Sequence, residues 1–285
     1  MPKNLKLLIA AVALLLVNVS LGAAQESKFA KLDSTKIHYK SYGQGKDALV
    51  LVHCWTCNLE LWRDQIPELS KRARVIALDL PGHGLSDKPK INYTMDLFAS
   101  AIDAVLKDAG VERAVLVGHS MGTPVVRQFY RKYPQKTLAL VIVDGLIRPF
   151  ASKEHREQFM APFRGPNYKE AGAQMLANIT ATLSAADKER VASSFLKTPQ
   201  YVLVSSMEGM NDESLYGPDK INVPVFALLA KSPFWPADTE EYLHGLAPDL
   251  EFVMWDGVSH YLFLDRPKEF NAAVIAFLDK KKLLK

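Results

Sequence analysis

The 285-residue sequence predicts an α/β fold in which helices cover a parallel β-sheet. Short, nearly continuous apolar runs recur along the chain, and such runs are typical of strands that are buried on both faces. Helix-like segments separate many of these runs, which favours right-handed crossovers between parallel strands. Hydrophobic residues make up 48% of the chain and no Pro/Gly/Ser-rich linker divides it, so we expect one large core, with room for a small accessory domain.

The predicted strands and helices alternate from residue 48 onward. The strands are the runs ALVLVH, ARVIALDL, RAVLVG, LALVIVD, VPVFALLA and LEFVMW, at 48–53, 73–80, 113–118, 138–144, 223–230 and 250–255. The helices are expected at 61–70, 94–109, 121–133 and 267–280. Upstream, residues 29–42 contain the alternating segment KIHYKSY, which predicts an antiparallel hairpin at the edge of the sheet.

One interval interrupts the alternation of strands and helices. Residues 146–217 contain helical patterns but no strand-like run. A helical insertion between two strands predicts a cap over the carboxyl edge of the sheet, where ligands bind in open α/β folds. The remaining core then consists of residues 25–145 and 218–285.

The first 24 residues have the pattern of a secretory signal peptide. Two lysines precede the uncharged run LLIAAVALLLV, and small residues follow it, so cleavage is expected after Ala24. This pattern predicts a secreted or periplasmic protein. The alternative is a retained N-terminal anchor, because residues 7–24 carry no charge and are just long enough to span a bilayer.

The charge of the chain gives no sign of a polyanionic partner. The sequence has 35 basic and 31 acidic residues, scattered along its length. We therefore expect no nucleic-acid partner and, once the leader is removed, no stable membrane partner.

The segment VLVGHSMG predicts a nucleophilic serine. Residues 118–122 fit the pattern G-x-S-x-G, and they join a predicted strand to a predicted helix. The two glycines allow a sharp turn that holds the Ser120 hydroxyl above the sheet edge, with the Met121 N–H beside it. A serine also needs a base, and His260 in DGVSHYLFLDRP follows the last predicted strand, where this fold keeps its histidine.

With these motifs in order, the chain resembles the α/β-hydrolase family over residues 29–285. The resemblance rests on LVH, DLPGHGLSD, GHSMG, the helical insertion and GVSHYLFLDRPKEFN. It implies a mostly parallel eight-stranded sheet with helices on both faces and a helical cap. It also implies that Ser86, in PGHGLS, belongs to a structural loop. A serine at position 120 argues against the dehalogenase and epoxide-hydrolase relatives, which use a carboxylate nucleophile there.

The acid that should orient His260 has two candidates. The family often places it just after the strand at 225–229, but this position falls near Ser232 or Pro233 here. Asp144 is the preferred candidate, because it ends the strand after the nucleophile, where some relatives keep the acid. Asp238 is the alternative, since it is the first carboxylate after the later strand.

The resemblance also implies an oxyanion hole made by the backbone N–H groups of Met121 and Trp55. Cys54 stands where the family commonly has glycine. Together with Cys57 it forms CWTC. In an exported protein the pair can form a local disulfide or remain two packed thiols. A thiol-oxidoreductase site is a further possibility, as is zinc binding with His53, although a fourth metal ligand is missing.

The function expected from these features is cleavage of a small to medium, fairly apolar ester or lactone by an exported serine hydrolase. The substrate is then a small-molecule ester, and the scheme requires no metal or organic cofactor. His119, Phe150 and Phe163 are expected to contact the substrate, although cap aromatics can equally serve packing. Alternatives are perhydrolase, thioesterase or C–C hydrolase chemistry with the same triad, and a non-catalytic ligand-binding protein on the same fold.

Overall fold

The computed structural model describes residues 27–149 and 151–284, so the predicted signal peptide and Phe150 lie outside the described residues. Eight strands form one sheet in the order β1-β2-β4-β3-β5-β6-β7-β8. Only the β1–β2 and β2–β4 pairs are antiparallel, and all other neighbours run parallel. The predicted fold class is therefore confirmed. The strands are β1 Lys28–Leu32, β2 Thr35–Tyr42, β3 Ala48–Val52, β4 Val75–Leu78, β5 Ala114–His119, β6 Thr137–Val143, β7 Val225–Ala230 and β8 Leu250–Trp255.

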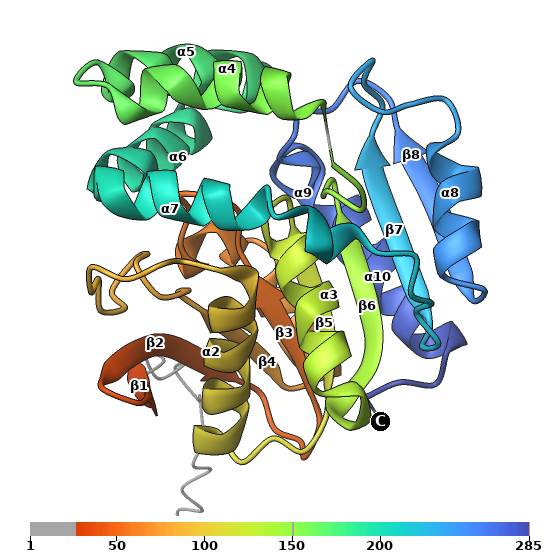
Figure 1. The fold of residues 1–285 in the computed structure, drawn as a ribbon. Helices are drawn as coiled ribbons and strands as arrows, with labels where there is room; N and C mark the ends of the chain where they lie inside the picture. The colour runs from red at the N-terminus through yellow and green to blue at the C-terminus, as the bar shows by residue number, and fades with distance from the viewer. Residues whose placement is uncertain (1–26, 150, 285) are drawn as a thin grey trace, which may run out of the picture.

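Helices cover both faces of this sheet (Figure 1). Helices α2 and α3 pack against each other on one face, and α1 packs against α10 on the other. The helices outside the insertion are α1 Ile66–Arg72, α2 Met95–Asp108, α3 Gly122–Lys132, α8 Thr239–Leu246, α9 Leu262–Asp265 and α10 Pro267–Lys280. None of the helices in the described ranges is long and apolar enough to cross a bilayer.

The helix predicted at 61–70 is wrong in its boundaries. A 3-10 turn at Leu59–Trp62 comes first, and α1 begins only at Ile66. Pro67 accounts for the break, because proline lacks the N–H that a continuous helix would use and is tolerated only in the first turn. Helix α8, which the sequence analysis did not predict, follows β7.

Four helices lie between β6 and β7, within the interval 146–217. They are α4 Lys153–Arg164, α5 Tyr168–Ile179, α6 Ala185–Lys197 and α7 Gln200–Met210, and we call them the cap helices. Serine side chains cap two of them: Ser152 accepts a hydrogen bond from His155 N–H, and Ser184 accepts one from Asp187 N–H. Figure 1 shows the cap helices above the carboxyl ends of the central strands.

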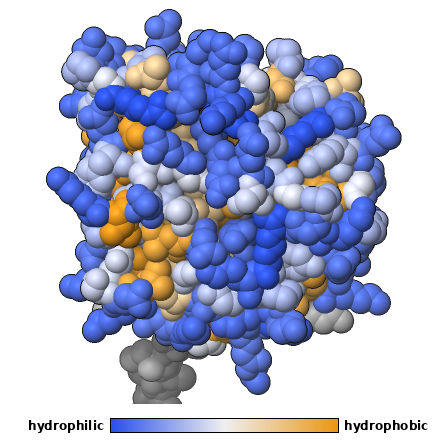
Figure 2. Space-filling model, viewed as in Figure 1, coloured by the Kyte–Doolittle hydropathy of each residue, from blue (hydrophilic) through white to orange (hydrophobic). Residues whose placement is uncertain are grey.

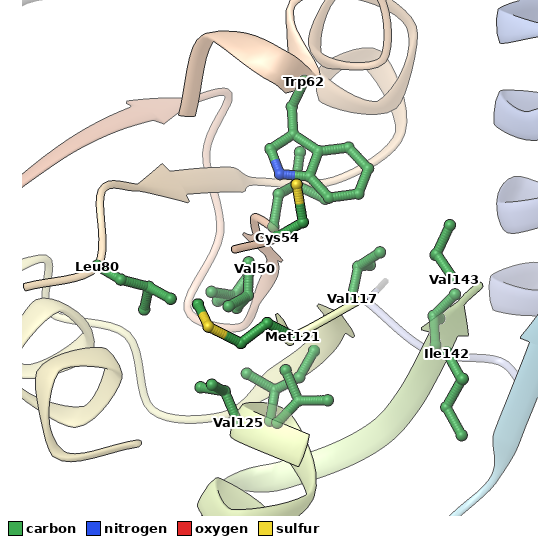
Figure 3. Packing of buried hydrophobic residues seen from close by; sticks show 14 of the residues in the cluster. Val50, Cys54, Trp62, Leu80, Val117, Met121, Val125, Ile142 and Val143 are labelled. Atoms are coloured by element: carbon green, nitrogen blue, oxygen red, sulfur yellow. The ribbon is translucent and has the colours of Figure 1, made fainter. Parts of the chain in front are cut away.

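The core is continuous from the sheet into the loops at its carboxyl edge. Val50 and Val117 come from adjacent strands and share this core with Leu80, Met121 and Val125 (Figure 3). Strands β3, β4, β5 and β7 are buried throughout, as the apolar runs predict. On the outside, the face seen in Figure 2 is mostly hydrophilic, with hydrophobic residues gathered toward the left of the view. The central strands are thus a rigid base for the loops that follow them.

Helix α3 approaches β3 so closely that its first residue must be glycine. A Cβ atom on Gly122 would lie 2.6 Å from the Val52 carbonyl oxygen and 3.1 Å from that of His53. Both contacts are to backbone, which cannot rotate away, so any larger side chain would push the helix off the sheet.

We expect Gly122→Ala to lower the free energy of unfolding by about 1 to 3 kcal/mol, the usual range for overpacking. The matched control is Gly245→Ala in α8, where an added Cβ meets no atom within 4 Å. Alanine is the better helix former, so the control should be as stable as the wild type or slightly more so. Urea unfolding followed by circular dichroism measures both, and equal stability of the two variants would contradict the close approach.

Candidate active site

Ser120 sits on a strained turn between β5 and α3. Its φ is +54°, a left-handed conformation that residues other than glycine rarely adopt. The Ser120 N–H donates to the Val143 carbonyl at 3.0 Å, and the Ser120 carbonyl accepts from Thr123 N–H at 2.9 Å. A Cβ on Gly118 would lie 2.4 Å from the Gly122 carbonyl oxygen, so the turn requires glycine there. Such strain at one buried turn is typical of a functional position.

His260 is held by Asp144. The His260 Nδ1 and Asp144 Oδ2 atoms are 2.6 Å apart, and because a carboxylate only accepts, Nδ1–H is the donor. The second carboxylate oxygen of Asp144 accepts from Ala230 N–H at 2.8 Å. Both oxygens are therefore oriented by the protein, and His260 keeps the lone pair of its Nε2 for a substrate or a serine.

The alternative acid, Asp238, lies elsewhere. Its carboxylate is exposed and pairs with the Arg148 guanidinium, with N–O distances of 2.5 and 3.1 Å. The ion pair with Arg148 holds the pKa of Asp238 below its ordinary value. Of the two carboxylates, the structure thus brings Asp144, the residue that directly follows β6, to His260. Asp238 lies farther along the chain after β7 and is held at the surface by Arg148.

The loop that carries His260 is also held from behind. The Ser259 N–H and Oγ–H both donate to Asp265 Oδ2, at 2.7 and 2.6 Å. The His119 Nε2–H donates to the His260 carbonyl at 2.8 Å. These bonds connect the histidine loop to α9 and to the serine turn, which limits the movement of the imidazole.

His119 therefore lies behind the site. The prediction that it contacts the substrate is wrong. The ring is fully buried and does not line the cavity described below. Burial lowers the pKa of His119 well below its ordinary value, and the neighbouring His260 lowers it further, so the ring stays neutral. With Nε2 protonated toward the carbonyl, the unprotonated Nδ1 has no hydrogen-bond partner among the described residues.

Ser120 and His260 line one cavity of about 470 Å³ beneath the cap helices. Among the hydrogen bonds of the described residues, none joins the two side chains. In unliganded enzymes such bonds are often long and tighten only with substrate. Most of the apolar wall comes from the cap and from the loop after β7. It includes Leu146, Phe159, Met175, Leu176, Ile179, Met207, Met210, Pro233, Phe234 and Trp235.

Polar groups in the cavity wall are few. Thr56, Asn178, Lys231, Ser232 and Ser259 contribute to it, together with Ser120, Asp144 and His260. A mostly apolar cavity with a few convergent polar groups suits a small apolar molecule with one reactive polar centre.

The prediction that Phe163 contacts the substrate is also wrong. Its side chain is 2% exposed and does not line the cavity. The ring packs edge-on against Trp55, with 5.3 Å between centroids, and lies tilted against Phe159, also at 5.3 Å. Phe163 thus packs behind Phe159 and Trp55, which line the cavity. The methionines of α5 and α7 line the cavity instead. The only sequence feature that could have predicted this is the frequency of methionine in the cap segment.

The backbone N–H groups of Met121 and Trp55 form no backbone hydrogen bond in the described part of the chain. Met121 directly precedes α3, at the end of the helix that carries partial positive charge. Trp55 lies in the loop after β3 and lines the cavity. These are the two groups that the sequence analysis expects to form the oxyanion hole.

Cys54 and Cys57 form a disulfide, one of the alternatives expected from CWTC. In the described state this bond excludes free packed thiols and zinc ligation by the pair. The thiol-oxidoreductase site stays a prediction, because a redox-active pair also forms a disulfide when it is oxidised. The His53 ring is likewise occupied, since it hydrogen-bonds the Cys54 carbonyl at 2.8 Å and the Leu80 N–H at 3.0 Å. The disulfide therefore closes the loop that carries Trp55.

Comparison with known proteins finds relatives that match parts of this chain. Among curated relatives, the chain is 32% identical over 122 residues to the dihydrolipoyllysine-residue acetyltransferase component of an acetoin cleaving system from Cupriavidus necator, covering 43% of this chain and 33% of that protein. It is 39% identical over 153 residues to the pimeloyl-[acyl-carrier protein] methyl ester esterase of Vibrio campbellii, covering 53% of this chain and 55% of that one. The chain thus spans about a third and about half of the lengths of these two relatives.

Among solved structures, the chain is similar to Est816, described as an N-acyl homoserine lactone degrading enzyme. The TM-score is 0.75 at 25% identity, and the match covers 88% of this chain and 100% of that one. The family model described as alpha/beta hydrolase fold matches residues 47–267, which include the serine turn, Asp144 and His260. The chain belongs to the alpha/beta hydrolase fold family.

Proposed function

We propose that this chain is an exported serine hydrolase that cleaves a small to medium, fairly apolar carboxylic ester or lactone. The observation that carries the proposal is the Asp144–His260 hydrogen bond of 2.6 Å beside the strained Ser120, in one apolar cavity. The Vibrio relative is named as a methyl ester esterase and Est816 as a lactone-degrading enzyme, which supports carboxylic ester chemistry. Export rests on the sequence pattern at residues 1–24 alone.

The proposed reaction begins with attack of the Ser120 Oγ on the acyl carbon while the His260 Nε2 takes the hydroxyl proton. Asp144 holds the imidazole by its Nδ1–H and stabilises the imidazolium that forms. The carbonyl oxygen becomes an oxyanion and accepts hydrogen bonds from the Met121 and Trp55 N–H groups.

The intermediate then collapses, and the C–O bond to the leaving group breaks. His260 returns its proton to the departing alkoxide, which leaves as the alcohol, or stays attached as a hydroxyl if the substrate is a lactone. Water, deprotonated by His260, attacks the acyl-serine ester next. Release of the acid restores the Ser120 hydroxyl and the neutral imidazole.

Replacing the nucleophile should abolish turnover. We expect the wild type to hydrolyse short p-nitrophenyl esters and to react with a fluorophosphonate probe, and Ser120→Ala to do neither. The matched control is Ser86→Ala, since Ser86 donates its hydroxyl to the Asp79 carbonyl at 2.6 Å and lies outside the cavity. Labelling that persists in Ser120→Ala would place the nucleophile elsewhere, and a wild type that binds esters without turnover or labelling would favour a non-catalytic binding protein.

Replacing the acid should slow the reaction without changing the shape of the cavity. Asp144→Asn keeps the shape of the side chain but no longer favours the Nδ1–H tautomer, so kcat should fall by about 10⁴. The same substitution at Asp238, which breaks only an exposed ion pair, should change kcat by less than about twofold. Steady-state kinetics on one ester compare the two variants, and the reverse ranking would assign the acid to Asp238.

Export is tested separately from catalysis. When the full sequence is expressed in a bacterial host, we expect the protein in the extracytoplasmic fraction to begin at Gln25. N-terminal sequencing and intact mass measure this. Full-length protein in the membrane fraction would instead support a retained anchor.

A further inference from the structure

The loop that supplies one oxyanion donor is fastened to the cap helices. We call residues 54–58 the oxyanion loop. The Trp55 indole Nε1–H donates to the Leu203 carbonyl of α7 at 2.9 Å. Its ring also lies edge-on to Phe163 of α4 and Phe195 of α6, with centroid distances of 5.3 and 6.4 Å. One side chain of the oxyanion loop therefore contacts three of the four cap helices.

A second connection runs from the next residue to α6. The Thr56 carbonyl accepts hydrogen bonds from the Ser194 hydroxyl at 2.8 Å and from the Thr198 hydroxyl at 3.4 Å. The Ser194 hydroxyl in turn accepts from the Asn58 side-chain amide at 3.0 Å. Ser194 is buried and does not line the cavity. It thus joins both ends of the Thr56–Asn58 segment to one helix without being within reach of a substrate.

The backbone at Thr56 needs such support. Its φ is +58°, and a β-branched residue in the left-handed region is a genuine outlier that persists only where its surroundings hold it. Within the described chain, the hydrogen bonds that Trp55 and Thr56 make to other elements all go to the cap. The sheet supplies none of them. The Cys54–Cys57 disulfide closes the loop, and both of its sulfur atoms lie 3.8 Å from the Tyr261 hydroxyl.

We propose that Ser194 and the Leu203 carbonyl are positioning groups for the oxyanion hole, so that the cap sets the rate of the chemical step as well as the shape of the cavity. The inference rests on the proposed serine-hydrolase function. Its physical basis is that the Trp55 N–H stabilises the transition state only when it points at the developing oxyanion. Loss of the cap hydrogen bonds lets the strained loop relax and turns that N–H away.

The test uses Ser194→Ala and the full-length enzyme, with p-nitrophenyl acetate as a substrate whose acyl group is too short to depend on the distant cap wall. We expect kcat to fall by about tenfold with KM changed by less than about twofold, because the lost interaction acts in the transition state. Ser193→Ala is the matched control on the same helix, and its kcat should equal that of the wild type. Trp55→Phe keeps a ring but removes the indole N–H, and it should also lower kcat.

A second readout separates positioning from a structural role. A boronic acid forms a tetrahedral adduct with a catalytic serine and places an oxygen in the oxyanion hole, so its Kd should weaken in Ser194→Ala by the same factor as kcat falls. Thermal unfolding should show that this variant remains folded. Unchanged kcat and boronate affinity, or a raised KM alone, would overturn the positioning role. A wild type that lacks turnover and Ser120 labelling would instead overturn the proposed function on which it rests.

Discussion

The site depends on the close approach of β3, β5 and α3 at the carboxyl edge of the sheet. Gly118 and Gly122 allow a turn in which Ser120 adopts a φ of +54°. The turn is bonded to the neighbouring strand, since the Ser120 N–H donates to Val143, the last residue of β6. The position of the serine therefore follows from backbone packing.

The end of β6 also carries Asp144, the carboxylate that holds His260. Asp144 follows Val143 directly and has a φ of +41°, so the chain turns sharply at the end of β6 and presents the carboxylate at the sheet edge. Its two oxygens bind the Ala230 N–H at the end of β7 and the His260 imidazole after β8. One carboxylate thus connects three adjacent strand ends, and both of its oxygens accept hydrogen bonds.

Hydrogen bonds across the edge of the sheet make the cap and the core one unit. The oxyanion loop leaves β3 and is bonded to α6 and α7, while Arg148, between β6 and the cap, pairs with Asp238 in the loop after β7. The insertion therefore contributes to the cavity wall and also holds the loop that carries Trp55. An apolar wall also excludes water, which strengthens the polar interactions at the reacting centre.

Local sequence patterns determined the strands, the serine turn and the position of His260, because apolar runs and G-x-S-x-G constrain the backbone within a few residues. Tertiary structure decided which of Asp144 and Asp238 contacts His260, since Asp144 is 116 positions from His260 and only the fold brings the two residues together. It also decided that methionines, rather than Phe163 and His119, face the cavity. The rotation and packing of a helix determine which of its side chains face the cavity, and no short stretch of sequence contains that information.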